Sequence, residues 1–154
     1  MNWLQTEFST NLKSLIDNWN LNTNRWLRLV AFERTPRTVS HMLTFCLSAV
    51  WHGFYPGQYI LFTLGFLGQR LQPIINRHIT QRLPEKGISG FLVKFCYWAL
   101  FHFWFSYLGI LFTIRFWSKC LMFMKATYFY GHVMAISLLL IPYKRILPYK
   151  NKSE

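Results

Sequence analysis

Five histidines are the side chains of this sequence best suited to acid–base chemistry: His41, His52, His78, His102 and His132. An imidazole exchanges its proton near neutral pH, and an ionisable group in an apolar segment is costly enough to suggest a function. His52 differs from the others because Pro56 and Gly57 interrupt the helical pattern just after it, which predicts irregular backbone beside a polar cavity. Taken alone, a histidine in such a segment is more often a hydrogen-bonded packing residue.

Cysteine chemistry and metal binding are not indicated by the spacing of the cysteines. Cys46, Cys96 and Cys120 are widely separated and form neither a CxxC pair nor a Cys/His cluster with zinc spacing. We therefore expect three buried thiols, no structural disulfide and no metal site.

The sequence, including the segments that carry four of the five histidines, has the composition of a membrane protein. Hydrophobic residues make up 53% of the 154 residues and charged residues only 14%, which excludes an ordinary soluble domain, a disordered chain and a secreted disulfide scaffold. Residues 38–69, 95–114 and 126–143 contain no Asp, Glu, Lys or Arg. Because about 20 apolar residues cross the hydrocarbon core as a helix, the sequence predicts an all-α, multi-pass transmembrane protein.

The segment of residues 38–69 is too long for one straight span and too short for two complete ones. As a single helix its 32 residues would be about 48 Å long. The break at Pro56 and Gly57, with Gly53 nearby, therefore predicts a pair of short helices or a re-entrant hairpin around His52.

The remaining segments divide into an interfacial part and two spans. Residues 1–37 carry recurrent charges, and Trp19 and Trp26 lie seven positions apart, which predicts amphipathic helices in or near the membrane interface. Residues 95–114 and 126–143 are each expected to form a transmembrane helix. The aromatic side chains of the first of these are compatible with a groove for an acyl chain and with simple helix packing.

The net charge of +12 is explained by membrane orientation. If residues 38–69 enter and leave on one side and the two later segments cross once each, 14 of the 17 basic residues share one side. The positive-inside rule then places both termini, a basic loop at residues 70–94 and a basic tail at residues 144–154 in the cytosol. Acidic lipid headgroups or an anionic substrate are secondary partners of these charges, and nucleic acid is not favoured.

Two strings of the sequence resemble signature motifs of the membrane-bound O-acyltransferase (MBOAT) family. Residues 19–28 read WNLNTNRWLR and are similar to the family pattern W-N-x-x-T-x-x-W-L. Residues 48–57 read SAVWHGFYPG and are similar to W-H-G-x-x-P-G-Y, except that Gln58 replaces the last tyrosine and Tyr59 follows it. A third, Tyr-rich pattern that ends in histidine is echoed by Tyr128–His132.

The likeness is strongest to the lysophospholipid acyltransferase branch of that family. Family members have several hundred residues and about ten membrane helices, so the resemblance implies that residues 1–154 correspond to the C-terminal part of an MBOAT acyltransferase domain. We expect the broken helix around His52 to belong to the helical core of that domain.

The resemblance implies transfer of a fatty acyl group from acyl-CoA to the free hydroxyl of a lysophospholipid, a step of phospholipid remodelling. His52 would act as the general base that takes the hydroxyl proton. Asn20 would orient the acceptor or donate a hydrogen bond to the developing oxyanion. Direct transfer between two substrates held together needs no acyl-enzyme and no cofactor, with acyl-CoA as co-substrate.

Four more residues of the motifs are candidate substrate contacts: Trp19, Thr23, Trp51 and Tyr59. The two tryptophans are also compatible with packing or interfacial anchoring, and Asn20 with capping or bridging helices. We interpret His132 as a structural residue.

Two other functions stay open at this point. One is an inactive, truncated membrane fragment that associates with a full-length homologue or with the missing N-terminal helices. The other is acylation of a protein or peptide acceptor.

The last five residues, KNKSE, resemble a dilysine retrieval signal, which with cytosolic termini implies the endoplasmic reticulum membrane. The headgroup and the acyl chain are not specified by these motifs.

Overall fold

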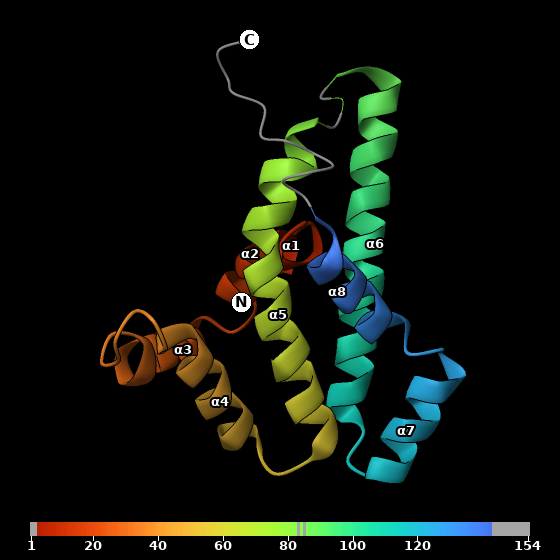
Figure 1. Ribbon diagram of the computed structural model, residues 1–154. Coiled ribbons are helices and arrows are strands. Elements are labelled where there is room, and N and C mark those ends of the chain that lie inside the picture. Colours follow the sequence, from red (N-terminus) through yellow and green to blue (C-terminus); the bar gives the residue numbers. More distant parts are fainter. Residues whose placement is uncertain (1–2, 83, 85, 143–154) are drawn as a thin grey trace.

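The computed structural model describes residues 3–82, 84 and 86–142, and the regular structure within them is entirely helical (Figure 1). The α-helices are α1 (Trp3–Glu7), α2 (Leu12–Trp19), α3 (Leu21–Leu27), α4 (Ser40–His52), α5 (Pro56–His78), α6 (Gly87–Thr113), α7 (Trp117–Ala126) and α8 (Tyr130–Leu140). A π-helical turn, η1 (Arg28–Phe32), follows α3, and a 3₁₀ turn, η2 (Thr80–Arg82), follows α5. The prediction of an all-α protein is confirmed for the described residues.

The two longest helices, α5 and α6, run antiparallel and form the frame of the fold (Figure 1). Pro56 stands in the first turn of α5, where its missing N–H removes no hydrogen bond. Among the described residues, α6 is the one helix both long and apolar enough to cross a membrane, judged by length and composition. Helix α8 is apolar as well, but its 11 residues extend only about 16 Å.

The break predicted beside His52 is present. Helix α4 ends at His52, and Gly53 has a φ of 119°, a conformation that glycine adopts without steric cost. Three residues separate the two helices, since α5 begins at Pro56. The segment thus forms a pair of helices, although only α4 is short.

The helices do not follow the charge-free segments closely. Helix α5 continues through Arg70 as far as His78, so that the connection to α6 is much shorter than residues 70–94. Charged side chains mark where a helix meets a polar environment, not where it ends, and basic residues stabilise the C-terminal end of a helix. Similarly, residues 127–129 form a turn in which Tyr128 and Phe129 have positive φ values, and α8 begins only after it.

The core lies where α2, α5, α6, α7 and α8 meet. It consists of Leu12, Leu64, Trp104, Tyr107, Leu108, Leu111, Cys120, Met124 and Ala135. Two glycines allow close packing against it, because a Cβ on Gly68 would lie 2.6 Å from the Trp104 ring and one on Gly131 would lie 2.3 Å from the Tyr107 ring. Helix α6 supplies most of the large side chains of this core, while α5 packs against α2, α4, α6, α7 and α8.

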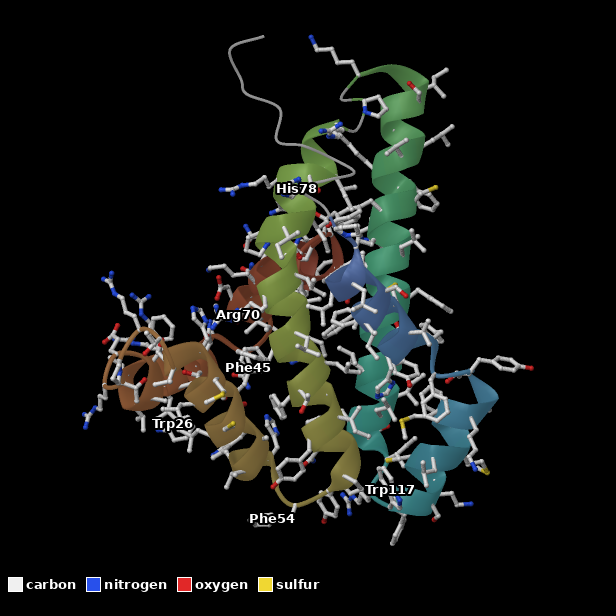
Figure 2. The ribbon with its side chains drawn as sticks, viewed as in Figure 1. Trp26, Phe45, Phe54, Arg70, His78 and Trp117 are labelled. Carbon is white, nitrogen blue, oxygen red and sulfur yellow. The ribbon has the colours of Figure 1, made fainter. Side chains whose placement is uncertain are left out.

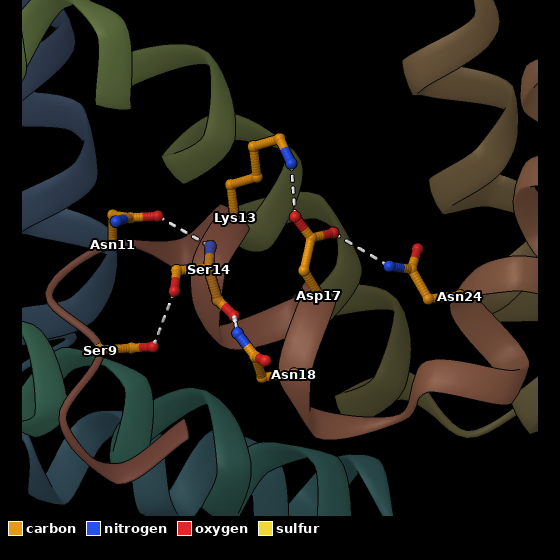
Figure 3. A network of polar contacts seen from close by, with 7 residues as sticks. All are labelled: Ser9, Asn11, Lys13, Ser14, Asp17, Asn18 and Asn24. Atoms are coloured by element: carbon orange, nitrogen blue, oxygen red, sulfur yellow. Dashed lines mark hydrogen bonds and ion pairs between the residues drawn. The ribbon is translucent and has the colours of Figure 1, made fainter. Parts of the chain in front are cut away.

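A polar network joins α2 to α3 (Figure 3). Asn11 caps α2 by accepting a hydrogen bond from the Ser14 N–H at 2.7 Å. Asp17 pairs with Lys13 and accepts a hydrogen bond of 2.9 Å from the Asn24 amide. Within the segment predicted to be amphipathic, the structure has helices between residues 3 and 32, and the interfacial position of residues 1–37 stays a prediction.

Candidate active site

His52 lies where α4, α5 and α6 converge. Its ring packs edge-on against the neighbouring Trp51 ring at 4.7 Å and against Phe112 of α6 at 5.1 Å, and it stacks on Phe62 of α5 at 5.4 Å, all measured between ring centroids. The imidazole is therefore half-buried among three aromatic rings that come from three helices.

The two ring nitrogens of His52 have no hydrogen-bond partner among the residues that the structure describes. His102 and His132 differ, since the Nδ1 of His102 lies 3.1 Å from the Trp98 carbonyl oxygen and that of His132 lies 2.9 Å from the Tyr107 hydroxyl. His41 is exposed on the surface of α4. A half-buried imidazole with both nitrogens available is the arrangement that a ligand-binding or proton-transferring histidine needs.

The turn after His52 is secured by a residue to which the sequence motifs assign no role. Gln58 is only 8% exposed, and its side-chain amide faces the carbonyl oxygens of His52 and Gly53. With its nitrogen on that side, the amide donates hydrogen bonds of 3.1 and 3.3 Å to them. The only sequence signal for Gln58 was its departure from the motif.

Asn20 occupies the joint between α2 and α3. Its Oδ1 accepts a hydrogen bond of 3.3 Å from the Thr23 backbone N–H, so the side chain caps α3. Thr23 takes part through its backbone. Asn20 and His52 have no hydrogen-bond or ring-contact partner in common among the described residues, so the structure does not join the two candidate catalytic residues directly.

Tryptophans nevertheless bring the two motifs side by side. Trp26 of α3 lies 6.1 Å from Trp51 of α4, and Trp51 in turn packs on His52. Trp19 packs edge-on against Phe105 of α6 at 5.6 Å. Trp19 and Trp51 are about half exposed, at 48% and 55%, which leaves both with surface available for other contacts.

The Tyr-rich stretch before α8 packs against α6. Tyr107 is fully buried, and its hydroxyl shares the 2.9 Å hydrogen bond with His132. The Trp104 indole donates to the Gly131 carbonyl oxygen at 3.1 Å, and the Tyr130 hydroxyl donates to the Phe103 carbonyl oxygen at 2.9 Å. These contacts hold α8 on α6, which is what a structural role for His132 requires.

The three cysteines do not share one environment. Cys120 is fully buried, whereas Cys46 and Cys96 are exposed, so the prediction of three buried thiols is wrong for two of them. Both exposed thiols lie on faces of α4 and α6 that the other described elements leave uncovered. In the described part of the chain, no group of three His, Cys, Asp or Glu side chains is placed to hold a metal ion.

The model of the membrane-bound O-acyltransferase family matches residues 1–114 of this sequence. The chain belongs to the MBOAT family. It is 32% identical over 151 residues to membrane-bound glycerophospholipid O-acyltransferase 2 of Homo sapiens, an alignment that covers 97% of this chain and 29% of the human protein.

Two more relatives of this MBOAT chain carry related names. Lysophospholipid acyltransferase 6 of Drosophila melanogaster is 57% identical over 65 residues, which cover 42% of this chain and 9% of the fly protein. The lysophospholipid acyltransferase of Saccharomyces cerevisiae is 31% identical over 140 residues, which cover 83% of this chain and 22% of the yeast protein. The chain thus spans less than a third of the length of these relatives.

Proposed function

We propose that this MBOAT chain takes part in moving a fatty acyl group from acyl-CoA to the free hydroxyl of a lysophospholipid. Family membership and the names of the relatives support acyl transfer to a glycerophospholipid-type acceptor. The observation that carries the proposal is the His52 imidazole, half-buried among three rings with both nitrogens unpartnered in the described part of the chain.

In this mechanism His52 is the general base. It takes the proton of the acceptor hydroxyl while that oxygen attacks the thioester carbonyl carbon, and the resulting tetrahedral intermediate collapses by releasing the CoA thiolate. The protonated imidazole then returns the proton to the thiolate. Such general-base assistance contributes about 10²- to 10⁴-fold in rate, and no covalent acyl-enzyme forms.

Asn20 is proposed to act through the part of its amide that capping does not use. Its Oδ1 is occupied by the Thr23 N–H, while its Nδ2 has no partner among the described residues. That nitrogen is available to donate to the acceptor or to the oxyanion of the tetrahedral intermediate, an interaction worth about 3 kcal/mol when a single donor is lost.

The principal test is acyl transfer by membranes that contain the protein. We expect radiolabelled acyl-CoA and a lysophospholipid to give the diacyl product, and His52→Ala to lower turnover by at least about 100-fold at equal expression. His41→Ala is the matched control, since His41 lies on the same helix but is exposed. Retained turnover in His52→Ala would overturn the mechanism.

The role of Asn20 is separated from its cap by comparing two substitutions. Asn20→Asp keeps an oxygen that accepts from the Thr23 N–H but removes the amide donor, whereas Asn20→Ala removes both. We expect both variants to lose activity and only Asn20→Ala to lose stability, by about 1 kcal/mol. Full activity of Asn20→Asp would show that Asn20 serves as a helix cap alone.

The basic segment of residues 70–94 is proposed as an orientation signal and not as the site of acyl transfer. Figure 2 shows His78 and Phe54 at opposite ends of α5. The 23 residues of α5 place these ends about 33 Å apart, so Arg77 and Arg82 lie far from His52. We propose a multi-pass arrangement in the endoplasmic reticulum membrane with cytosolic termini; Lys150 and Lys152 of the retrieval-like tail lie outside the described residues.

A second function is favoured by the size of the match. The chain corresponds to at most 29% of the human relative, and large apolar side chains such as Phe91 and Phe103 are exposed on α6. An inactive membrane fragment that associates with other helices would fit both facts. Purifying the 154-residue chain and assaying it alone discriminates, because activity without a partner eliminates this alternative. A panel of lysophospholipid and peptide acceptors tests the third possibility, a protein or peptide substrate.

A further inference from the structure

The C-terminal end of α4 is contacted by a side chain from the next helix. The last carbonyl groups of any helix lack intrahelical donors and need other partners. Here the Gln58 amide faces the carbonyl oxygens of His52 and Gly53 at 3.1 and 3.3 Å, and an amide nitrogen carries the two N–H groups that this requires. Tyrosine, which the family motif has at this position, supplies only one donor.

Gln58 is itself held on a rigid support. It lies in the first turn of α5, next to Gly57, and a Cβ at Gly57 would be only 1.9 Å from the Leu111 carbonyl oxygen of α6. The start of α5 therefore rests directly on the backbone of α6. A donor fixed in this way places the end of α4 relative to both other helices that enclose His52.

We propose that Gln58 is a positioning residue for His52, on the basis of the function proposed above. By bonding the His52 carbonyl oxygen, Gln58 keeps the last turn of α4 wound and holds the imidazole against Phe62 and Phe112. Without that bond, the turn frays and the ring leaves the place from which it reaches the acceptor hydroxyl. The replacement of the motif tyrosine is thus a functional feature of this chain.

The first test separates kcat from KM. Gln58→Leu, which has a similar shape but cannot donate, is expected to lower kcat about 10- to 100-fold with little change in KM, since a reacting group displaced by about 1 Å costs this much. Gln72→Leu is the matched control, because Gln72 donates a side-chain hydrogen bond to Tyr97 of α6 near the other end of α5. Equal losses in the two variants would overturn the proposal.

A second substitution distinguishes loss of positioning from misfolding. Gln58→Glu keeps the shape, but its carboxylate accepts only and faces two carbonyl oxygens, whereas its protonated form regains one donor. We expect the ratio of its kcat to the parent kcat, taken at the same pH, to rise as the pH is lowered. A ratio that stays constant across the pH range would contradict positioning through a donated hydrogen bond.

A third measurement does not depend on activity. Diethyl pyrocarbonate modifies imidazole nitrogens, and mass spectrometry of the peptides reports the rate at His52. We expect this rate to rise several-fold in Gln58→Leu, where the ring leaves its aromatic surroundings, and to stay at the parent value in Gln72→Leu. Unchanged labelling in Gln58→Leu would refute the positioning role. Altered labelling in a protein without acyl transfer would instead refute the proposed function alone.

Discussion

The contact between α5 and α6 at Gly57 yields the sharpest stability prediction. A Cβ at this position would lie 1.9 Å from the Leu111 carbonyl oxygen and 2.9 Å from that of Ile114. Both are backbone atoms of α6 and its C-terminal end, so no side chain can turn away to make room. To reach an ordinary contact distance, the two helices have to separate by roughly 1.5 Å.

Separating the two helices lowers the free energy of unfolding, because it disrupts their tight packing. Overpacking a tight interior costs typically about 1–3 kcal/mol, and Gly57→Ala should fall at the upper end because Leu111 is fully buried. For a chain of this size each kcal/mol corresponds to about 2–4 °C in the melting temperature. We therefore expect Gly57→Ala to melt about 5–10 °C below the parent, and to lose activity because the turn that follows His52 moves with α5.

Gly109 provides the internal control, since it is also helical and a Cβ there would meet nothing within 4 Å. Gly109→Ala should raise stability by about 0.5–1 kcal/mol through the lower backbone entropy of the unfolded chain. Thermal unfolding in detergent, monitored by size-exclusion chromatography, gives the melting temperatures of both variants. An unchanged melting temperature in Gly57→Ala, or an equally strong destabilisation in Gly109→Ala, would contradict this prediction.

Three further predictions concern single contacts. Tyr107→Phe removes the hydroxyl bonded to His132 but keeps the buried ring, so it should cost about 1 kcal/mol; an unchanged melting temperature would contradict a contribution from this bond. Burial raises the pKa of the Cys120 thiol, so less thiolate is present at a given pH. We therefore expect maleimide to label Cys120 slowly at pH 7, faster as the pH rises, and rapidly after denaturation. Fast labelling of the folded protein would disprove burial. Lys13→Ala breaks only an exposed ion pair with Asp17 and should change stability by less than about 1 kcal/mol, so a larger shift in calorimetry would show that the pair is part of a stronger network.

Local patterns predicted the broken helix well. The Pro56–Gly57 pair disfavours a continuous helix, and the structure interrupts the helix at residues 53–55, directly before this pair. The limits of the charge-free segments predicted the ends of the helices poorly, because charge depends on the polarity of the surroundings and not on where a helix ends. Arg70 therefore lies inside α5, and the last apolar segment begins with a turn at residues 127–129.

The contacts of the candidate site were less accessible to sequence reasoning. The Tyr107–His132 hydrogen bond joins residues 25 positions apart, and no local pattern pairs them. The rings around His52 come from three helices, so their convergence follows only from the packing of α4, α5 and α6. The motifs did single out His52 and Asn20, but the cap that Asn20 forms on α3 depends on where α2 ends.

The π-helical turn η1 has a consequence for how this region tolerates changes in length. At its end the Glu33 N–H donates to the Arg28 carbonyl oxygen at 2.9 Å. This hydrogen bond spans five residues instead of the four of an α-helix, so the turn contains one additional residue. Removing one residue between 28 and 32 would restore the ordinary repeat without breaking the helix, whereas a deletion inside α4 would rotate His52 by about 100° away from its neighbours. Within the helices of residues 21–52, a deletion of one residue should therefore be tolerated best at η1.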